Sequence, residues 1–499
     1  MHDRLSAILL APDATIRDAM EAIDRGGVEI ALAVDADTRL VGVLTDGDVR
    51  RALLGGAALS DPVLPFVNRH PHVVSPAAAR GDVIDLMRNT GLSEVPVLDD
   101  DGNLVGLHLL QELLGSPAQP SMATQIPLAV PHLAGNELRY LRECIETGFV
   151  SSVGPFVDRF EREFAEAVGA RHAVACASGT AALHVALVLS GVVAGSEVMV
   201  PTFTFIASAN AVSYIGARPL LVDSEMATWN MDGQLVHDEI ARRARAGEAL
   251  PAAIQVVHVL GHPADMEPLL AVQSEYGVPI VEDAAEALGA TYTSGTFAGR
   301  SVGTVGAIGC FSFNGNKVMT SGGGGMIVTD DPTVAARAKH LTTQAKLPGH
   351  GYVHDEIGFN YRLTNLSAAL GVAQLEQLDQ FVAAKRRLAL RYDGLLSALP
   401  VTVPPRAVWA DPSFWLYSIL LDDDGPSPDE VVAALVGDGI QARPLWPPLH
   451  RQPPYLGAAT LGGGVAEVIH RHGLSLPSSV ALTEAEQTRV VERLAKVLA

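Results

Sequence analysis

Short apolar runs rich in β-branched residues alternate with helical stretches from about residue 126 onward. The run HAVACAS is followed by GTAALHVALVLSG, and VPIVED is followed by AAEALGA. This alternation is typical of a largely parallel sheet covered by helices. We therefore predict an α/β fold here, with functional side chains at the carboxyl ends of the strands, where ligands of such folds bind.

Three features fall at the ends of predicted strands or in the loops just after them. Gly179 and Thr180 open a helix directly after a strand, where free backbone N–H groups and the helix dipole favour an anion. Asp283 ends the strand VPIVED, and Phe205 follows the strand EVMVP. Each has an ordinary alternative: an N-cap, a helix cap and a core aromatic.

Lys317 lies between the predicted strand AIGCFSF and the four glycines 322–325. An amine beside a desolvating wall loses part of its preference for the charged form and can then form a Schiff base with an aldehyde. An anion site, a stacking ring, a carboxylate and such a lysine are together what pyridoxal phosphate requires. We predict this cofactor, with Lys317 catalytic and Asp283 holding the ring nitrogen protonated.

Residues 126–499 resemble the DegT/StrS-type sugar aminotransferases in the stretches ASGTAAL, VEDAAEALGA, FSFNGNK and IGFNYRLTNLSAALG. The resemblance implies a fold-type I aminotransferase, with a mostly parallel large domain and a small αβ C-terminal domain. It implies that Lys317 is catalytic and that the cofactor is bound by Gly179, Thr180, Phe205, Asp283, Glu286, Ser312 and Asn360.

The same resemblance carries further expectations. Glu286 stands where many members have Gln or His near the ring hydroxyl. Asn360 is implied to contact the phosphate in the neighbouring subunit's site, so we expect a homodimer or a higher homo-oligomer with shared sites. Arg362 and His450 are implied to face the substrate. His450 lies in the loop ARPLWPPLHRQPPY, whose basic residues suit a sugar-nucleotide diphosphate, although a solvated loop stiffened by prolines is the alternative.

An internal repeat marks the first part of the chain. VEIALAVDADTRLVG (28–42) aligns without a gap with LSEVPVLDDDGNLVG (92–106), at an offset of 64 residues (106 − 42). Repeats this short cannot bury their apolar faces alone, so the two should pack together.

Residues 1–117 resemble a pair of CBS repeats, which implies an α/β tandem repeat with an adenine nucleotide in the cleft between its copies. Thr45 and Asp48 have the spacing that holds a ribose in that family, whereas the second copy has Leu109 and Glu112. The alternative is that Asp48 only caps the following helix.

A Pro- and Ser-containing stretch follows the repeat. The predicted domains are a CBS pair (1–117), a linker (118–127), a cofactor-binding large domain (128–385) and a small domain (386–499).

Composition narrows the function further. The net charge is −21, which argues against nucleic-acid binding because phosphate contacts need a basic face. The three cysteines are widely separated, so we expect neither disulfides nor a metal site. No window approaches the ~20 apolar residues of a membrane span, and no signal peptide is visible. We expect a cytoplasmic protein that does not bind membranes.

A narrower resemblance addresses the substrate. EDAAEALGATY and SFNGNKVMTSGGGGMIVTDD resemble the branch that acts on UDP-linked 4-keto-6-deoxy-N-acetylhexosamines in legionaminic-acid or bacillosamine-like surface-sugar and lipopolysaccharide synthesis. We favour transamination of UDP-2-acetamido-2,6-dideoxy-hexos-4-ulose with glutamate as donor, regulated by adenine nucleotide. The alternative is a perosamine-synthase-like enzyme using GDP-4-keto-6-deoxymannose. An alternative function of another class is that of an adenylate-sensing regulatory protein with an inactive aminotransferase domain. The intact Lys317 and Asp283 argue against this alternative.

Overall fold

The computed structural model describes residues 5–110, except positions 6, 27, 36, 37, 77, 79 and 100, and residues 125–498, except position 350. The chain divides into two compact units, residues 1–123 and 124–499. Glu112 and most of the predicted linker, residues 118–124, lie outside the described residues.

The first unit contains the predicted repeat, and its elements recur at the predicted offset. In the first copy, α2 (Ile16–Gly26) precedes the antiparallel pair β2 (Ile30–Val34) and β3 (Leu40–Thr45). In the second copy, α4 (Arg80–Thr90) precedes the antiparallel pair β4 (Glu94–Leu98) and β5 (Leu104–Leu109). Each bound differs by 64 residues between the copies (80 − 16, 94 − 30, 104 − 40).

The strand register repeats as well. Ile30 pairs with Thr45 and Glu94 with Leu109, and a bulge follows Ala33 in one copy and Val97 in the other. The first copy also has β1 (Leu9–Leu10), parallel to β2, and α3 (Asp46–Leu54) after β3. The repeat seen in the sequence is therefore a repeat of backbone structure.

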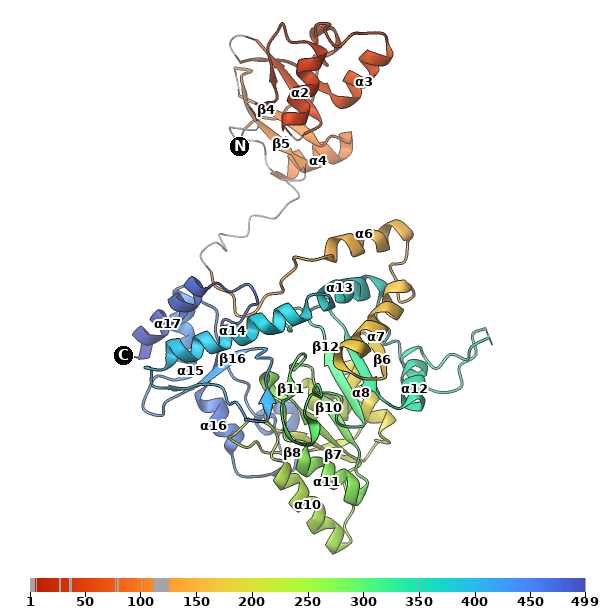
Figure 1. Cartoon of the computed structure of the whole chain (residues 1–499), viewed down its shortest axis with the longest axis vertical. Helices are drawn as coiled ribbons and strands as arrows, with labels where there is room; N and C mark the ends of the chain where they lie inside the picture. The colour runs from red at the N-terminus through yellow and green to blue at the C-terminus, as the bar shows by residue number, and fades with distance from the viewer. Residues whose placement is uncertain are drawn as a thin grey trace. The chain divides into compact units, whose positions relative to one another are not determined.

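The second unit is built on an eight-stranded sheet (Figure 1). Neighbouring strands are parallel except β13, which runs antiparallel to β12 and β6. In spatial order the strands are β18 (Thr460–Leu461), β8 (Arg218–Val222), β7 (Glu197–Pro201), β9 (Ala253–Val257), β10 (Ile280–Asp283), β12 (Ile308–Ser312), β13 (Gly325–Thr329) and β6 (His172–Cys176).

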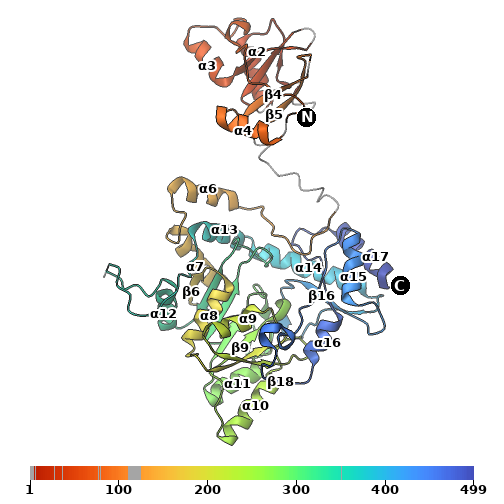
Figure 2. The ribbon, with the colours of Figure 1, turned by 180° about the vertical axis from the view of Figure 1, so that it is seen from behind.

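Helices cover both faces of this sheet, as Figures 1 and 2 show from opposite sides. Alternate strand residues such as Val281 and Cys310 pack against α8 (Gly179–Leu189), α9 (Ala207–Tyr214) and α12 (Pro332–Thr342). Their neighbours Ile280 and Phe311 face the opposite layer, which contains α7 (Pro155–Val168), α10 (Gly233–Ala246), α11 (Glu267–Tyr276) and α13 (Asn365–Leu375). The helices on both faces of a mostly parallel sheet confirm the predicted α/β class. Burial on both faces also explains why these strands are continuously apolar.

The last part of the chain forms a smaller layered structure with its own core. Its antiparallel sheet has the order β14 (Val401–Thr402), β16 (Tyr417–Leu421), β19 (Gly473–Leu476) and β17 (Arg443–Pro444), and its helices are α14 (Leu378–Leu396), α15 (Pro428–Gly437), α16 (Val465–His472) and α17 (Glu484–Leu498). The predicted boundary at 385/386 falls inside α14, which joins the two sheets as one helix.

Two shorter features complete the second unit. Helix α6 (Glu137–Thr147) precedes α7, and β11 (Thr291–Tyr292) pairs with β15 (Ala410–Asp411). Within the described ranges, no helix has both the length and the apolar character that crossing a membrane requires.

Candidate active site

A cavity of about 480 Å³ opens at the carboxyl ends of the central strands of the large sheet. Its other wall comes from the C-terminal layer and includes Trp415, Arg443 and Trp446. Residues from distant parts of the sequence meet here because parallel strands place their carboxyl ends along one edge. The predicted residues that line this cavity are Gly179, Thr180, Phe205, Asp283, Glu286, Ser312 and Lys317.

The N-terminus of α8 forms the anion-binding end of the cavity. Helix α8 begins at Gly179, and a Cβ placed on Gly179 would lie 2.7 Å from the Cβ of Ser312. A Cβ on Gly325 would lie 2.4 Å from the carbonyl oxygen of Ser178. These two glycines therefore let the start of the helix pack directly against the β12–β13 pair. Backbone N–H groups and the Thr180 and Ser312 hydroxyls are thereby gathered at one place, which suits a phosphate.

Asp283 is fixed at the end of β10 by its neighbours. Its Oδ2 accepts a hydrogen bond from the Ser208 hydroxyl at 2.8 Å, and its Oδ1 accepts one from the backbone N–H of Ala285 at 3.1 Å. The Ser208 hydroxyl lies 3.0 Å from that of Thr204. Burial raises the pKa of Asp283, although the Ser208 and Ala285 bonds and the nearby Lys317 act to lower it. Such a carboxylate favours a cationic partner, which a protonated pyridine nitrogen provides.

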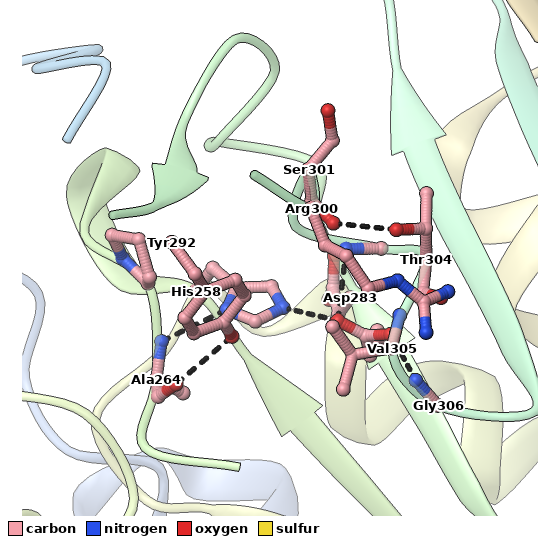
Figure 3. A network of polar contacts seen from close by, with 12 residues as sticks. His258, Ala264, Asp283, Tyr292, Arg300, Ser301, Thr304, Val305 and Gly306 are labelled. Carbon is pink, nitrogen blue, oxygen red and sulfur yellow. Dashed lines mark hydrogen bonds and ion pairs between the residues drawn. The ribbon is translucent and has the colours of Figure 1, made fainter. Parts of the chain in front are cut away.

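A buried network anchors the loops behind Asp283 (Figure 3). His258 Nε2 lies 2.9 Å from Oε2 of Glu282, and His258 Nδ1 accepts a hydrogen bond from the backbone N–H of Ala264 at 3.0 Å. The Glu282 carboxylate also accepts backbone N–H groups of Gly303 and Val305, at 2.8 and 2.7 Å. Burial alone would raise the pKa of Glu282, but His258 and the backbone N–H groups of Gly306 and Gly303 lower it below its usual value. This carboxylate is satisfied within the fold and has a structural role.

Lys317 follows β12 and lines the cavity. Its side chain is 14% exposed, and its Nζ lies 3.9 Å from Oε1 of Glu286 and 3.9 Å from the centroid of the Trp415 ring. Burial lowers the pKa of the amine, while the carboxylates of Glu286 and Asp283 act to raise it. Burial therefore favours the neutral amine, whereas the two carboxylates favour the charged ammonium.

Glu286 is buried opposite this amine. Its Oε2 accepts a hydrogen bond from the backbone N–H of Leu260 at 2.9 Å. Burial raises the pKa of Glu286 to about 7, against the lowering effects of Lys317 and the Leu260 bond. Near neutral pH this carboxyl can therefore gain or lose a proton, which a Gln at the same place cannot do.

Phe205 completes the set that fits pyridoxal phosphate. Its side chain is 54% exposed although it follows a buried strand, so it is not the core aromatic that the alternative required. A ring on the cavity wall, backbone donors at a helix start, a buried carboxylate and an enclosed amine all face one space. These residue types match the ring, phosphate, ring nitrogen and aldehyde of the cofactor.

Three other predicted residues do not line the cavity. Asn360 is exposed, and its backbone pairs with that of Thr343. Arg362 lies at other surface hollows, and its guanidinium donates to the carbonyl of Ser152. Both ring nitrogens of His450 are hydrogen-bonded within the protein. Nδ1 lies 2.7 Å from Thr202 Oγ1, and Nε2 lies 2.8 Å from Glu467 Oε1. The roles predicted for these residues stay predictions.

Thr45 and Asp48 in the first unit form a capping box at the start of α3. Asp48 Oδ2 accepts the backbone N–H and the hydroxyl of Thr45, at 2.9 and 2.6 Å, and its Oδ1 accepts from Arg51. A carboxylate offers about four acceptor positions. Three are thus occupied, and the helix cap weighed from the sequence is present; ribose binding stays a prediction.

The sequence did not point to several residues of the cavity. Ser208 lies in a helix with no local sign of its bond to Asp283, and Trp415 lies in FWLYSILL, which reads as a buried strand. Arg443 belongs to the basic loop considered for a diphosphate, and it does line the cavity. Arg451 of the same loop instead pairs with Glu467 at 2.8 Å.

Comparison with known proteins agrees with this geometry. Residues 131–495 match the model of the DegT/DnrJ/EryC1/StrS aminotransferase family, and residues 5–55 and 63–107 match that of the CBS domain. GDP-perosamine synthase of Caulobacter vibrioides is 42% identical over 377 residues, which cover 75% of this chain and 98% of that protein. GDP-perosamine synthase of Escherichia coli O157:H7 is 37% identical, with coverages of 74% and 97%.

A crystal structure of a DegT DnrJ EryC1 StrS aminotransferase from Brucella abortus matches with a TM-score of 0.68 and 30% identity, over 73% of this chain and 95% of that one. The predicted fold class is therefore confirmed down to the fold family. The chain belongs to the DegT/DnrJ/EryC1/StrS aminotransferase family, carries CBS domains in its N-terminal unit, and is a pyridoxal-phosphate-dependent sugar aminotransferase.

Proposed function

We propose that the protein transfers the amino group of glutamate to carbon 4 of GDP-4-keto-6-deoxymannose. The observation that carries this proposal is the 42% identity to a GDP-perosamine synthase over 98% of that protein's length. The sequence analysis preferred a UDP-linked N-acetylhexosamine. The comparisons favour its alternative, because GDP-perosamine synthases recur among the relatives at 37–42% identity.

The cavity residues supply the binding of the cofactor. Gly179, Thr180 and Ser312 would hold its phosphate, and Phe205 would stack on its ring. Asp283, fixed by Ser208, would keep the ring nitrogen protonated. When bound, pyridoxal phosphate supplies an aldehyde that carries the amino group and a ring that takes up electrons.

Lys317 is the proposed acid and base. Its amine is enclosed beside Glu286 and Trp415, and burial lowers its pKa. This shift favours the neutral amine, which is the form that would accept a proton from the α-carbon of the donor. The same amine returns a proton to carbon 4 of the sugar in the second half of the reaction. Glu286, with a pKa of about 7, adds a second group able to share protons at this place.

Arg443 is the proposed anchor of the sugar nucleotide. Its side chain is exposed at the cavity, and within the described ranges it has neither an ion pair nor a side-chain hydrogen bond. An unpaired guanidinium at the mouth of a cavity in a protein of net charge −21 suits a diphosphate, which it binds through two parallel hydrogen bonds. Arg362 and His450 stay proposed substrate residues, and Asn360 a proposed contact to the neighbouring subunit's cofactor in a homodimer.

The CBS unit is the proposed regulatory part. An adenine nucleotide bound there would alter the rate of the aminotransferase unit, and Thr45 and Asp48 are its proposed contacts. The Thr45–Asp48–Arg51 bonds leave about one acceptor position on Asp48 for a ribose hydroxyl. Assaying transamination with and without AMP or ATP tests this part of the proposal.

A substrate panel tests the reaction itself. Purified protein with pyridoxal phosphate and glutamate is incubated with GDP-4-keto-6-deoxymannose and, separately, with UDP-2-acetamido-2,6-dideoxy-hexos-4-ulose. Mass spectrometry should find the amino sugar from the GDP substrate, formed with at least tenfold higher kcat/KM. Equal or better use of the UDP sugar would reject the proposed substrate, and no amino product from either would reject both.

The role of Arg443 has a matched control in Arg493, an arginine on α17 of the same C-terminal layer. Arg443→Ala should raise KM for the sugar nucleotide about 10- to 100-fold, because a hydrogen bond to a charged group contributes roughly 1.5–3 kcal/mol. KM for glutamate should change little. Arg493→Ala, which removes an arginine paired with Asp438 outside the cavity, should leave both constants unchanged. An equal effect of the two substitutions would contradict the role of Arg443.

A further inference from the structure

Trp415 forms the side of the cavity that touches the catalytic amine. The residue is only 4% exposed, and the centroid of its ring lies 3.9 Å from Nζ of Lys317. Trp415 lies just before β16, in the C-terminal layer, whereas Lys317 lies between β12 and β13 of the large sheet. The contact therefore joins the two layers at the point where the chemistry takes place.

The ring is held in place from three directions. Its Nε1–H donates a hydrogen bond to the carbonyl oxygen of Asn316 at 2.6 Å. Its backbone carbonyl accepts one from Nζ of Lys385 at 2.9 Å. Its ring stacks on Trp446, with centroids 6.3 Å apart and planes inclined by 17°. Because the Asn316 bond is to the residue next to Lys317, the ring is fixed relative to the backbone that carries the amine.

The face of an indole ring distinguishes the two states of an amine. It attracts an ammonium through the ring quadrupole and attracts a neutral amine far less. The ionisable groups that act on Lys317 are Glu286, 3.9 Å away, and Asp283. Both carboxylates also favour the ammonium, so the ring and the acids bind the same state of the lysine.

We propose that Trp415 is a positioning residue, which holds the ammonium of Lys317 against its ring whenever that amine is not bonded to the cofactor. The hold weakens once the amine gives up its proton, so the neutral amine is free to act while the protonated amine stays at a fixed place. This rests on the proposed catalytic role of Lys317. It gives Trp415 a task that a purely structural core residue would not have.

The test measures the pKa of Lys317 in full-length protein freed of cofactor. Trace acetylation with acetic anhydride over a range of pH, read by peptide mass spectrometry, gives that pKa for wild type, Trp415→Phe and Trp415→Leu. Leu keeps the site apolar but has no ring face, and Phe keeps a ring face but has no N–H. The pKa of Lys317 should be about 0.5–1 unit lower in Trp415→Leu than in wild type, since losing the ring removes a stabiliser of the ammonium. Trp415→Phe should lie between them.

Two results would overturn the proposal. One is an unchanged pKa of Lys317 in Trp415→Leu. The other is a Phe variant shifted as far as the Leu variant, which would assign the effect to the Asn316 hydrogen bond rather than to the ring. Trp409→Leu, which removes an indole stacked on Tyr292 instead, is the control and should leave the pKa of Lys317 unchanged.

Fluorescence gives a second measurement that does not depend on the folding of Trp415→Leu. Lys317→Met removes the charge beside the ring and should change the tryptophan emission of cofactor-free protein. That change should vanish in a Trp415→Phe background, and its persistence there would contradict the contact. Neither measurement needs cofactor or sugar. A protein that shows these effects but forms no amino sugar would reject the proposed function and leave the contact between ring and amine standing.

Discussion

Two enclosed lysines, Lys317 and Lys385, differ in their surroundings, and the difference matches the catalytic role proposed for Lys317 and a structural role for Lys385. Lys385 lies on α14 and is 3% exposed; its Nζ donates hydrogen bonds to the carbonyls of Trp415, at 2.9 Å, and of Ser478. No carboxylate is among these partners. Lys317 instead faces a cavity, a carboxylate and an aromatic ring.

Burial lowers the pKa of both amines, and it lowers that of Lys385 to about 7. A lowered pKa therefore does not by itself distinguish the lysine proposed to be catalytic from the other one. A neutral amine has two N–H groups, which match the two carbonyls that Lys385 meets. Lys385 can therefore be buried without a carboxylate partner and serve a structural role. Lys317 is distinguished by the cavity in front of it and by two neighbours, Glu286 and Trp415, that stabilise its charged form.

The largest expected difference between the two lysines is in activity. Lys317→Ala should lower the rate of amino-sugar formation about 10³-fold or more, because the acid–base group is lost. Its melting temperature should stay close to that of the wild type, since the cavity already provides space around the side chain. Product formation by mass spectrometry and thermal unfolding measure the two quantities. Retention of a tenth of the wild-type rate would show that Lys317 is not catalytic.

Lys385→Met should show the opposite pattern, with stability as the main loss. The substitution leaves two buried carbonyls without donors, at about 1–3 kcal/mol each. The effect on unfolding should depend on pH. The pKa of Lys385 is about 7 in the folded protein, against an ordinary value of 10.5. Between these values the folded protein binds fewer protons than the unfolded chain, so wild-type stability rises with pH.

Thermal unfolding of cofactor-free protein at pH 7, 8 and 9 measures this dependence. The gap between wild type and Lys385→Met should widen toward pH 9. A constant gap would mean that Lys385 keeps its charge in the fold, and the contrast with Lys317 would then fail. Lys346→Met, at an exposed position, is the control and should shift stability by less than about 0.5 kcal/mol.

The smallest expected effect concerns the carboxyl that faces Lys317. Glu286 has a folded-state pKa of about 7 against an ordinary value of 4.5, so the folded protein binds more protons than the unfolded chain between these values and loses stability as pH rises. Glu286→Gln stays neutral, and its carbonyl oxygen can still accept from Leu260. The variant should gain about 2 kcal/mol relative to wild type between pH 4.5 and 7.

Melting curves across this range, with Glu492→Gln as an exposed control, measure that gain. An unchanged difference between wild type and Glu286→Gln from pH 4.5 to 7 would mean that Glu286 is already ionised beside Lys317. The two lysines would then differ more sharply, since only Lys317 would face a negatively charged carboxylate throughout this pH range.

Local sequence predicted the residues whose chemistry follows from their place at a strand end. Asp283, Lys317 and Gly179 each stand where a β-rich run gives way to a loop or helix, and parallel strands bring such places to one edge. Trp415 and Lys385 gave no such signal. A tryptophan in FWLYSILL and a lysine in KRRLALRYDG have the usual character of a buried strand and a charged helix, so their partners could not be read locally.

The sequence by itself determined the repeat in the first unit, the α/β alternation of the second and the strand-end residues of the cavity, because periodicity, turn residues and short motifs act over a few positions. The tertiary structure alone decided that the C-terminal layer closes that cavity with Trp415 and Arg443, and that His450 is bonded elsewhere. The contacts of Trp415 with Lys317 and of His450 with Thr202 join residues about 100 or more positions apart, and they depend on how two sheets and the helix between them pack. That packing also places one buried lysine before a cavity and the other against two carbonyls.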